Sequence, residues 1–404
     1  MPIGFKTYDR GDSQKIMAKL LWVACSSRSE YGLIRPLLKE LAASQECDNN
    51  SLGATLILYS DALSTCDGDA SRDLSHTSIK IVRLHGSKIR KGESINEHFG
   101  RLVHKFSRNE YYECDLLLVA GDRYELFALV QAAFYQQIPL AHLFGGDISN
   151  GGTFDDHVRH SMSHLASVHF PVNQTAYNNL ISMHQDKSRI FFIGSPVVDE
   201  LSSWSGLPDK VGKCDVLISF NPMTLESSNV VGHDLRLTLE ALELIQSQIT
   251  LRCLATFPNH EPGAQVIIDT YKDYEGREWF MAVKSLGSPK YLFAIRDAKI
   301  VLGNSSSQVL EVPLLGQRSL LIGNRQNGRH KPASVVHLPS VTDAHVMKEI
   351  ILNMLKTEAP QPCNDYGAAG VSRSIIKLIR QLIALPRKEL VRKNSPIALK
   401  ANLI

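Results

Sequence analysis

The chain has 404 residues, of which 44% are hydrophobic and 21% charged, and its formal net charge is +3. This length exceeds what one hydrophobic core supports and suits two domains of roughly 150 to 200 residues. The small charge, without a basic run interleaved with aromatic residues, argues against a nucleic-acid partner. No apolar run reaches the roughly 18 residues of a membrane span, and the first residues lack a signal-peptide core. We therefore expect a cytoplasmic protein without a membrane partner.

The first half alternates short apolar runs with amphipathic segments. A polar leader over residues 1–18 precedes them, and helices are expected at residues 33–43, up to residue 106, and between residues 120 and 138. Strands are expected at residues 20–25, 54–59, 79–84, 116–120, 138–143, 168–172 and 190–193. Strands joined through helices predict a parallel sheet with helices on both faces.

A second series of strands begins after the polar linker at residues 203–213. These strands are expected at residues 216–220, 251–255, from 291 onward, 300–302 and 319–322. A helix is expected at residues 366–385, followed by a solvated tail. The predicted fold is α/β with two Rossmann-like domains of parallel sheet, at residues 19–202 and 203–386, and a tail at residues 387–404. A cleft between two such domains is a favoured place for a small-molecule site.

Carboxylates stand where the strands of the first half stop and where a helix starts. Asp122 follows the strand at 116–120, Asp147 follows the next strand, and Asp155 and Asp156 open the following helix, just before Arg159. Ligands of open α/β sheets bind beyond the carboxyl ends of the strands. We therefore interpret these carboxylates as acid/base groups of one crevice, while turn formation and helix capping are the structural alternative for each.

The second half contains a candidate anion site at residues 302–313, which read as a strand, Gly-Asn-Ser-Ser-Ser and a helix. Backbone N–H groups at the helix start and the hydroxyls of Ser305 and Ser306 would form a cradle for phosphate. Glu311 is placed to accept hydrogen bonds from ribose hydroxyls. Helix capping by serine is the alternative interpretation.

Arginines from two turns complete this candidate site. Arg28 lies in the first strand-to-helix turn, and Arg325 and Arg329 follow the strand at 319–322. Guanidinium groups match the oxygens of a diphosphate. Because the chain lacks GxGxxG after its first strand and lacks GxxxxGK[ST], a nucleoside diphosphate carrying another group is favoured over a dinucleotide or ATP.

Histidines and cysteines do not favour a metal site. His157, His160 and His164 follow Asp156 on one helix, but helical histidine pairs are more often packed or solvated. The seven cysteines are scattered singly and predict free thiols. We expect neither a metal nor a cofactor.

Motifs spread over most of the chain resemble one protein family. They are SRSEYGLIRPLLKEL, GDRYE, IPLAHLFGGD, FDDHVRHSMSHLASVHF, IGSPVVDEL, GNSSSQVLEVP and GNRQNGRHKPASVV. In this order they resemble the hydrolysing UDP-N-acetylglucosamine 2-epimerases of sialic-acid biosynthesis. The resemblance implies a GT-B-like fold, a nucleotide held mainly by the second domain, a UDP-sugar substrate and a homodimer.

The resemblance also implies a reaction and its acid/base groups. The family eliminates UDP from UDP-N-acetylglucosamine and adds water across the resulting glycal, which gives N-acetylmannosamine for nonulosonic acids. By motif position, Asp122, Asp147 and Asp155 are the acid/base carboxylates, Asp156 is their neighbour, and Arg159 orients the carboxylates at the helix start.

Motif position assigns the nucleotide-binding residues in the same way. Arg28 would meet the diphosphate. The residues expected to hold or approach the UDP moiety are Asn221, His260, Ser305, Ser306, Glu311 and Arg325.

The chain departs from the family pattern at several positions, among them residues 366–369, which read Tyr-Gly-Ala-Ala in place of Y-G-D-G. Asp147 stands where relatives have glutamate, and Asn221 and Ala62 stand where relatives have histidine. Asparagine cannot shuttle a proton. The alternatives left open are a 2-epimerase of a UDP-4-acetamido-6-deoxy sugar of legionaminic-type pathways, a catalytically weakened sugar-nucleotide-binding paralogue, and a GT-B glycosyltransferase.

Overall fold

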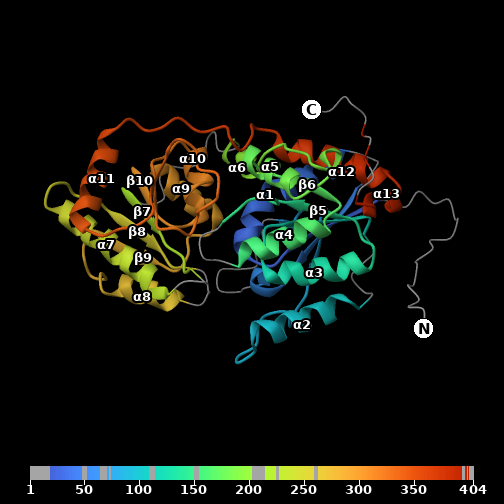
Figure 1. Cartoon of the computed structure of the whole chain (residues 1–404), viewed down its shortest axis with the longest axis horizontal. Coiled ribbons are helices and arrows are strands. Elements are labelled where there is room, and N and C mark those ends of the chain that lie inside the picture. The colour runs from blue at the N-terminus through green and yellow to red at the C-terminus, as the bar shows by residue number, and fades with distance from the viewer. Residues whose placement is uncertain are drawn as a thin grey trace.

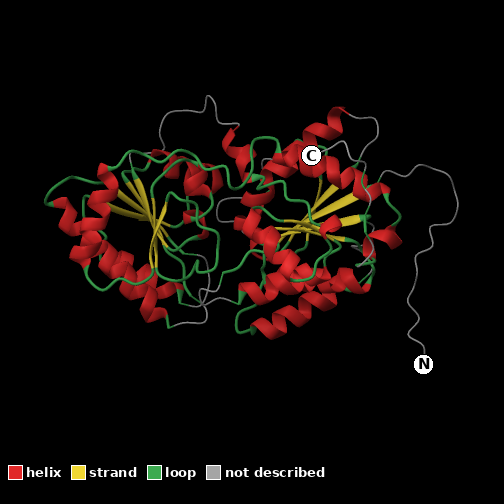
Figure 2. Cartoon of the chain, turned by 45° about the horizontal axis from the view of Figure 1, so that its top comes forward, coloured by secondary structure: helices red, strands yellow, loops and turns green. Residues whose placement is uncertain are grey.

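Two six-stranded parallel sheets, each covered by helices, form the two domains of the computed structural model (Figures 1 and 2). The structure describes residues 19–47, 52–63, 71, 74–108, 114–149, 154–202, 214–223, 227–258, 263–393, 396, 397 and 399. Both sheets have the Rossmann strand order 3-2-1-4-5-6. In this order the fourth strand is added on the other side of the first, so the direction of strand addition switches there. The expected fold class is confirmed.

The first sheet has the order β3-β2-β1-β4-β5-β6. Its strands are β1 (Leu20–Cys25), β2 (Gly53–Leu58), β3 (Lys80–Arg83), β4 (Leu116–Ala120), β5 (Leu140–Leu143) and β6 (Val168–Phe170). Its helices are α1 (Arg28–Cys47), α2 (Ile95–Phe106), α3 (Tyr124–Tyr135), α4 (Asp155–Leu165), α5 (Gln174–Ser182) and α6 (Val197–Ser202). Every residue of β4 is buried, as expected for a central parallel strand covered on both faces.

The second sheet has the order β12-β11-β10-β7-β8-β9. Its strands are β7 (Val216–Ser219), β8 (Cys253–Thr256), β9 (Phe280–Val283), β10 (Ile300–Gly303), β11 (Ser319–Ile322) and β12 (Val335–Leu338). The helices of this half are α7 (Ser228–Gln246), α8 (Ala264–Lys272), α9 (Ser288–Asp297), α10 (Glu311–Leu314) and α11 (Ala344–Lys356).

Two strand predictions are wrong, and two observed strands were not predicted. Residues 291–297 belong to helix α9, which begins directly after Gly287, and residues 190–193 contribute only an isolated bridge from Ile190 to His169. Strands β9 and β12 were not expected. Both are edge strands with exposed or half-buried residues, so they lack the continuous apolar run that marked the central strands.

The chain returns to the first domain at its end, as Figure 1 shows for the red helices. Helix α12 (Val371–Ala384) buries Ile375 and Ile379 in the same core as Leu37 and Leu41 of α1. The predicted boundary after residue 386 therefore assigned this helix to the wrong domain. Sequence order placed it in the second half, while its apolar face packs on the first.

The segment after α12 is also packed, which corrects the prediction of a solvated tail. Helix α13 (Arg387–Val391) buries Leu390. The guanidinium of Arg189 donates to the carbonyls of Leu390 at 3.0 Å and Glu389 at 2.8 Å, and also to that of Arg392. The segment thus supplies hydrogen-bond acceptors for the buried guanidinium of Arg189 in the first domain.

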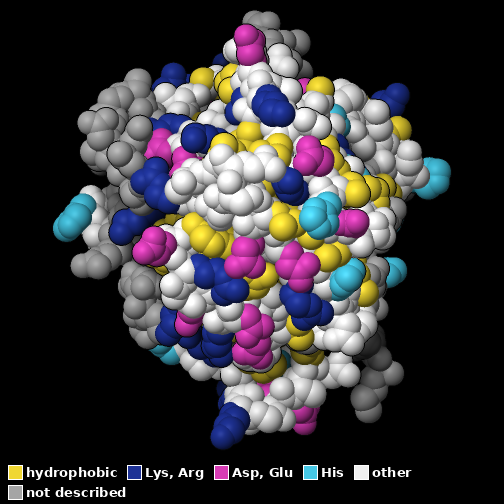
Figure 3. All heavy atoms as spheres, turned by 90° about the vertical axis from the view of Figure 1, so that its left-hand side faces the viewer, with side chains coloured by type: hydrophobic (Ala, Val, Ile, Leu, Met, Phe, Trp, Pro, Cys, Tyr) yellow, Lys and Arg dark blue, Asp and Glu magenta, His cyan; other side chains and the backbone are white. Residues whose placement is uncertain are grey.

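The outer face of the second domain carries acidic and basic side chains side by side, with hydrophobic groups between them (Figure 3). A shallow groove on the second domain lies between Leu237 and Leu244 of α7 and the start of α11. None of the described helices is both long and apolar enough to cross a lipid bilayer.

Asp199 fixes the start of α12, whose own cap residue, Gly370, has no side chain to do so. Its carboxylate accepts hydrogen bonds from the backbone N–H of Gly370 and of Ser372, both at 2.6 Å. We expect Asp199→Ala to lower the free energy of unfolding by about 1–2 kcal/mol, as for loss of a helix cap. Urea denaturation measures this. Asp269→Ala, which removes an exposed ion pair with Lys272, is the control and should cost less than about 0.5 kcal/mol.

Candidate active site

The carboxylates of the first domain gather around the buried guanidinium of Arg159, which is 1% exposed. Its Nη1 donates to Asp156 Oδ1 at 2.5 Å and to the backbone carbonyl of Asp147 at 2.9 Å. Its Nη2 pairs with the carboxylate of Asp122. A buried arginine needs partners for its donors, so these contacts hold the ends of β4 and β5 against the start of α4.

Asp156 is held from two sides. Besides Arg159, it accepts hydrogen bonds from the backbone N–H of Ser149 at 2.8 and 2.9 Å and from the Ser149 hydroxyl at 2.8 Å. These donors fix the position and orientation of the Asp156 carboxylate. Asp155 precedes it as the first, half-buried residue of α4.

Asp122 is ionised in this environment. Burial acts to raise the pKa of its carboxyl, but the charges of Arg159 and Arg329 outweigh burial and hold the pKa below its ordinary value. At neutral pH this residue can therefore accept a proton or stabilise a cation.

The neutral imidazole of His142 supports the turn that ends in Asp122. Its Nε2 lies 2.9 Å from the carbonyl of Gly121, and its Nδ1 lies 3.0 Å from the hydroxyl of Ser163. Burial lowers the pKa of His142 to about 4. Because a carbonyl only accepts, Nε2 carries the proton and Nδ1 accepts from Ser163. His142 was not among the residues predicted from the sequence. The feature that could have indicated it is a histidine inside an otherwise apolar strand.

The turn before Asp147 has little conformational freedom. Gly146 adopts φ +84°, and a Cβ atom there would lie 2.3 Å from the carbonyl oxygen of Ala176. Phe144 also has a positive φ of 67°, which is costly for a bulky residue. Asn179 donates to the Gly146 carbonyl at 2.8 Å. Glycine is therefore required for β5 to turn sharply enough to aim Asp147 along its present direction.

Asp147 meets the second domain. Its Oδ2 lies 3.5 Å from Nε of Arg329, in the segment between β11 and β12. Its Oδ1 is buried and has no hydrogen-bond partner among the residues that the structure describes. The acid/base candidates of the first domain thus lie against the arginine-bearing segment of the second.

The candidate nucleotide residues of the second domain meet at the carboxyl ends of its central strands. The backbone N–H of Asn221, after β7, donates to Asn304 Oδ1 at 2.7 Å, and Asn304 Nδ2 donates to the Asn221 carbonyl at 2.9 Å. Gln326 donates to the Asn304 carbonyl at 2.9 Å, and Arg325 Nε donates to the Pro222 carbonyl at 3.0 Å. These bonds join the segments that follow β7, β10 and β11.

The expected serine-capped helix differs in length from the observed one. A single 3-10 turn, Ser306–Gln308, follows β10, and helix α10 (Glu311–Leu314) comes after it. The Ser305 hydroxyl accepts from the Ser307 N–H at 3.4 Å. Such short segments lack the dipole that we expected at a long helix start. The hydroxyls remain accessible, because Ser305 is half-buried and Ser306 exposed.

Glu311 lies close to this turn with an uncommitted oxygen. Its Oε2 is buried without a hydrogen-bond partner in the described part of the chain, and burial raises the pKa of its carboxyl. A ligand with hydroxyl groups would satisfy this oxygen.

The Arg28 side chain and His260 lie outside the residues that the structure describes. Ala62 is fully buried in the first hydrophobic core, so this position does not face a ligand. Within the described segments, no three histidine, cysteine, aspartate or glutamate side chains are grouped to hold a metal ion.

Glu30, which sequence analysis also missed, organises the turn between β1 and α1. Its Oε2 accepts from the N–H groups of Ser26 at 2.7 Å and Ser27 at 3.1 Å, and from the Ser26 hydroxyl at 2.9 Å. Burial raises the pKa of Glu30 to about 8, against the opposing effects of Arg123 and the Ser26 N–H. The available signal was the capping-box spacing of Ser27 and Glu30, three residues apart, just before the helix expected at residues 33–43.

The raised pKa of Glu30 gives a pH-dependent stability. Its protonated form is favoured in the folded protein, so its contribution is full below the ordinary value of 4.5 and is lost as the pH rises through about 8. We expect the Tm of the natural protein to fall relative to that of Glu30→Gln between about pH 5 and about pH 9. Differential scanning fluorimetry measures both curves. The exposed Glu240→Gln is the control, and parallel curves for Glu30→Gln would contradict the assignment.

The fold and this junction of two domains define a two-domain α/β protein of the GT-B-like class, in which acid/base candidates of one domain face Arg329 of the other. Solved structures share this fold. They include the UDP-GlcNAc 2-epimerase from Neisseria meningitidis bound to UDP-GlcNAc (19% identity, TM-score 0.70, 90% of this chain and 99% of that one). The Staphylococcus aureus MnaA–UDP co-structure is a second example (16% identity, TM-score 0.72, 95% and 100%).

Sequence comparison identifies the family. The family model described as UDP-N-acetylglucosamine 2-epimerase matches residues 71–380. Polysialic acid biosynthesis protein P7 from Escherichia coli is 28% identical over 92% of this chain and 96% of its own length. UDP-N,N'-diacetylbacillosamine 2-epimerase (hydrolyzing) from Legionella pneumophila is 25% identical over 91% and 97%. The chain belongs to the UDP-N-acetylglucosamine 2-epimerase family.

Proposed function

We propose that the protein is a hydrolysing 2-epimerase of a UDP-linked 2-acetamido sugar, with UDP-N-acetylglucosamine as its first candidate substrate. One observation supports this most: the Asp122, Asp147 and Arg159 cluster of the first domain lies against Arg329 of the second. Elimination of a diphosphate needs a base near C2 of the sugar and cations near the leaving group, and this junction contains both.

The chemistry divides between the carboxylates. A carboxylate takes the C2 proton, the C–H electron pair forms the C1=C2 bond, and the C1–O pair leaves with UDP. Water then adds at C1 while a carboxylic acid returns a proton to the other face of C2, which inverts that centre. Asp147 Oδ1 is uncommitted and suits proton transfer, while Asp122 is held ionised beside Arg159 and suits stabilisation of positive charge at C1. Asp155 is the candidate acid for rehydration.

The names of relatives support two candidate sugars for the substrate. Relatives act, by name, on UDP-N-acetylglucosamine or on UDP-N,N'-diacetylbacillosamine, whose sugar is a 4-acetamido-6-deoxy relative. A homodimer working in the cytoplasm for nonulosonic-acid synthesis is part of the proposal and follows the family resemblance.

Turnover of both sugar nucleotides in deuterated water tests the reaction. We expect UDP release together with a free 2-epimerised sugar that carries deuterium at C2, detected by NMR. Asp147→Asn should lower kcat by roughly a hundredfold to ten-thousandfold, the contribution of a general acid/base, while the protein still binds UDP. The exposed Asp269→Asn serves as the matched control. Release of UDP only when an acceptor is present would instead indicate a glycosyltransferase.

A second candidate function is a sugar-nucleotide-binding paralogue with weakened catalysis, and Asn221 favours it. This residue follows β7 and is 9% exposed, at a position where the family resemblance implies histidine. An imidazole can carry charge or a proton and an amide cannot.

Restoring the histidine tests the paralogue interpretation. If catalysis has weakened, Asn221→His should raise kcat by about tenfold or more, since general acid/base groups contribute on this scale. An Ala62→His change is unsuitable because that side chain would enter the packed core. Rapid turnover by the natural protein, unimproved by Asn221→His, would exclude the weakened form.

A further inference from the structure

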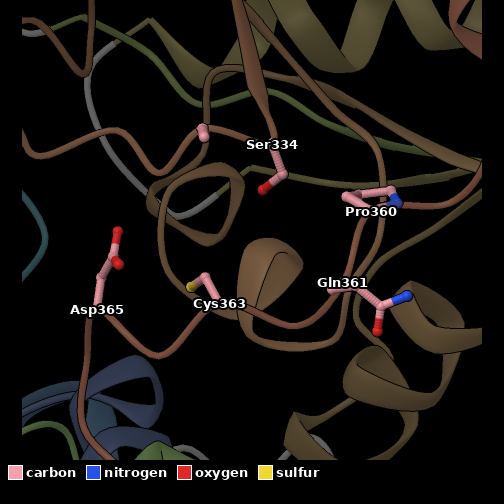
Figure 4. Close-up of a pocket in the computed structure, with 6 residues that line it drawn as sticks. Ser334, Pro360, Gln361, Cys363 and Asp365 are labelled. Atoms are coloured by element: carbon pink, nitrogen blue, oxygen red, sulfur yellow. The ribbon is translucent and has the colours of Figure 1, made fainter.

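Arg329 reaches across the domain junction from an anchored loop. The preceding Gly328 has φ +84°, and the Arg329 N–H donates to the Gln326 carbonyl at 3.3 Å. The next residue, His330, is bonded through Nε2 to Asp365 at 2.6 Å. Figure 4 shows Asp365 beside the hollow that it lines together with Ser334 and Cys363. The loop backbone is therefore fixed, and the Arg329 side chain extends from it toward the first domain.

The contact that Arg329 makes with Asp147 is an ion pair without a hydrogen bond. The 3.5 Å from Nε to Oδ2 is longer than a charge-assisted hydrogen bond, and both Arg329 Nε and Asp147 Oδ1 are buried without such a partner in the described part of the chain. Arg159 differs, since it donates to Asp156 at 2.5 Å. A guanidinium in this state gains more from a ligand with two adjacent oxygens than it loses by leaving Asp147.

The charge of Arg329 reaches the groups of both domains. It lowers the pKa of Asp122 and opposes the raised pKa of Glu311 in the second domain. The charged and titratable groups that face Asp147 are Arg159 from α4, Arg329 from its loop, and Tyr366 from the segment before α12. Arg159 already donates to the carboxylates of Asp122 and Asp156 and to the backbone carbonyl of Asp147. Arg329 makes no such hydrogen bond to Asp147, so it is the cation that can exchange partners.

We propose that Arg329 is a catalytic residue that changes partners during the reaction: it pairs with Asp147 in the free enzyme and with the diphosphate once the UDP-sugar binds. This inference rests on the proposed function. The exchange releases Asp147 to take the C2 proton at the moment when the leaving group gains a cation. The C2–H pair then forms the C1=C2 bond, and the C1–O pair departs on the diphosphate beside Arg329. Until substrate binds, the negative charge of Asp147 is thus balanced by Arg329.

Binding measurements test the diphosphate contact without requiring turnover. By isothermal titration calorimetry, Arg329→Gln should weaken UDP binding about tenfold to hundredfold, as expected for charge-assisted hydrogen bonds, and leave uridine binding unchanged. Arg329→Lys keeps the charge but not the planar fork, so it should recover only part of the UDP affinity. Arg277→Gln makes the same charge change at a surface pair with Glu243 and should alter neither. Equal UDP affinity in Arg329→Gln would overturn the proposal.

A double-mutant cycle of UDP binding tests the exchange of partners. If Asp147 competes with the diphosphate for Arg329, Asp147→Asn should tighten UDP binding severalfold in the natural protein. The same change should have no such effect in the Arg329→Gln background, where the cation is already absent. In the Arg329→Lys background part of the tightening should remain, because the charge is kept.

Other outcomes have distinct meanings. Equal tightening of UDP binding by Asp147→Asn with and without Arg329 would mean that Asp147 does not compete through Arg329, and no tightening in either background would mean that the ion pair does not oppose UDP binding; each result overturns the exchange. If the natural protein turns over no sugar nucleotide, the proposed function fails, and the contrast between UDP and uridine still decides whether Arg329 binds the diphosphate.

Discussion

The site depends on burying one arginine. Removing a guanidinium from water costs several kcal/mol unless its donors are matched, and Arg159 is matched by Asp122, by Asp156 and by the carbonyl of Asp147. These partners come from three different segments, after β4, after β5 and at the start of α4. The requirement to satisfy one cation therefore fixes the relative positions of the strand ends, and the geometry of the candidate acid/base carboxylates follows from a stability constraint.

The neighbouring groups extend this constraint outward. His142 fixes the carbonyl just before Asp122, Ser149 fixes Asp156, and Gly146 allows the turn that carries Asp147. Each support is a neutral or backbone group, so it adds no charge to a junction already crowded with carboxylates. The charges of the carboxylates are then balanced by two arginines, Arg159 within the first domain and Arg329 from the second.

Much of this arrangement was predictable from the chain. Strands such as β4 and β10 are continuous apolar runs, and Asp122, Asp147 and Asp156 follow strands or begin a helix, so the rule that parallel strand ends converge was sufficient to bring them together. Edge strands β9 and β12 were not predictable in this way because their half-exposed residues lack the pattern. The return of α12 to the first domain depends on which apolar face it meets, and periodicity does not encode that choice. Glu30 and His142 were missed because a polar residue among apolar neighbours reveals its partners only in three dimensions.

The aspartate at position 147 gives the domain junction its particular character. The family resemblance implies glutamate at this position, and the missing methylene shortens the reach of the carboxylate by roughly 1.5 Å. A longer side chain would have the reach to close the 3.5 Å to Arg329 into a hydrogen bond, which would hold the cation more tightly in the free protein. With aspartate, the pair is attracted through charge alone, and both partners retain uncommitted polar atoms. In the proposed reaction, the shorter side chain therefore favours a junction that a diphosphate can open at low cost, at the expense of a base that stands further from its own cation.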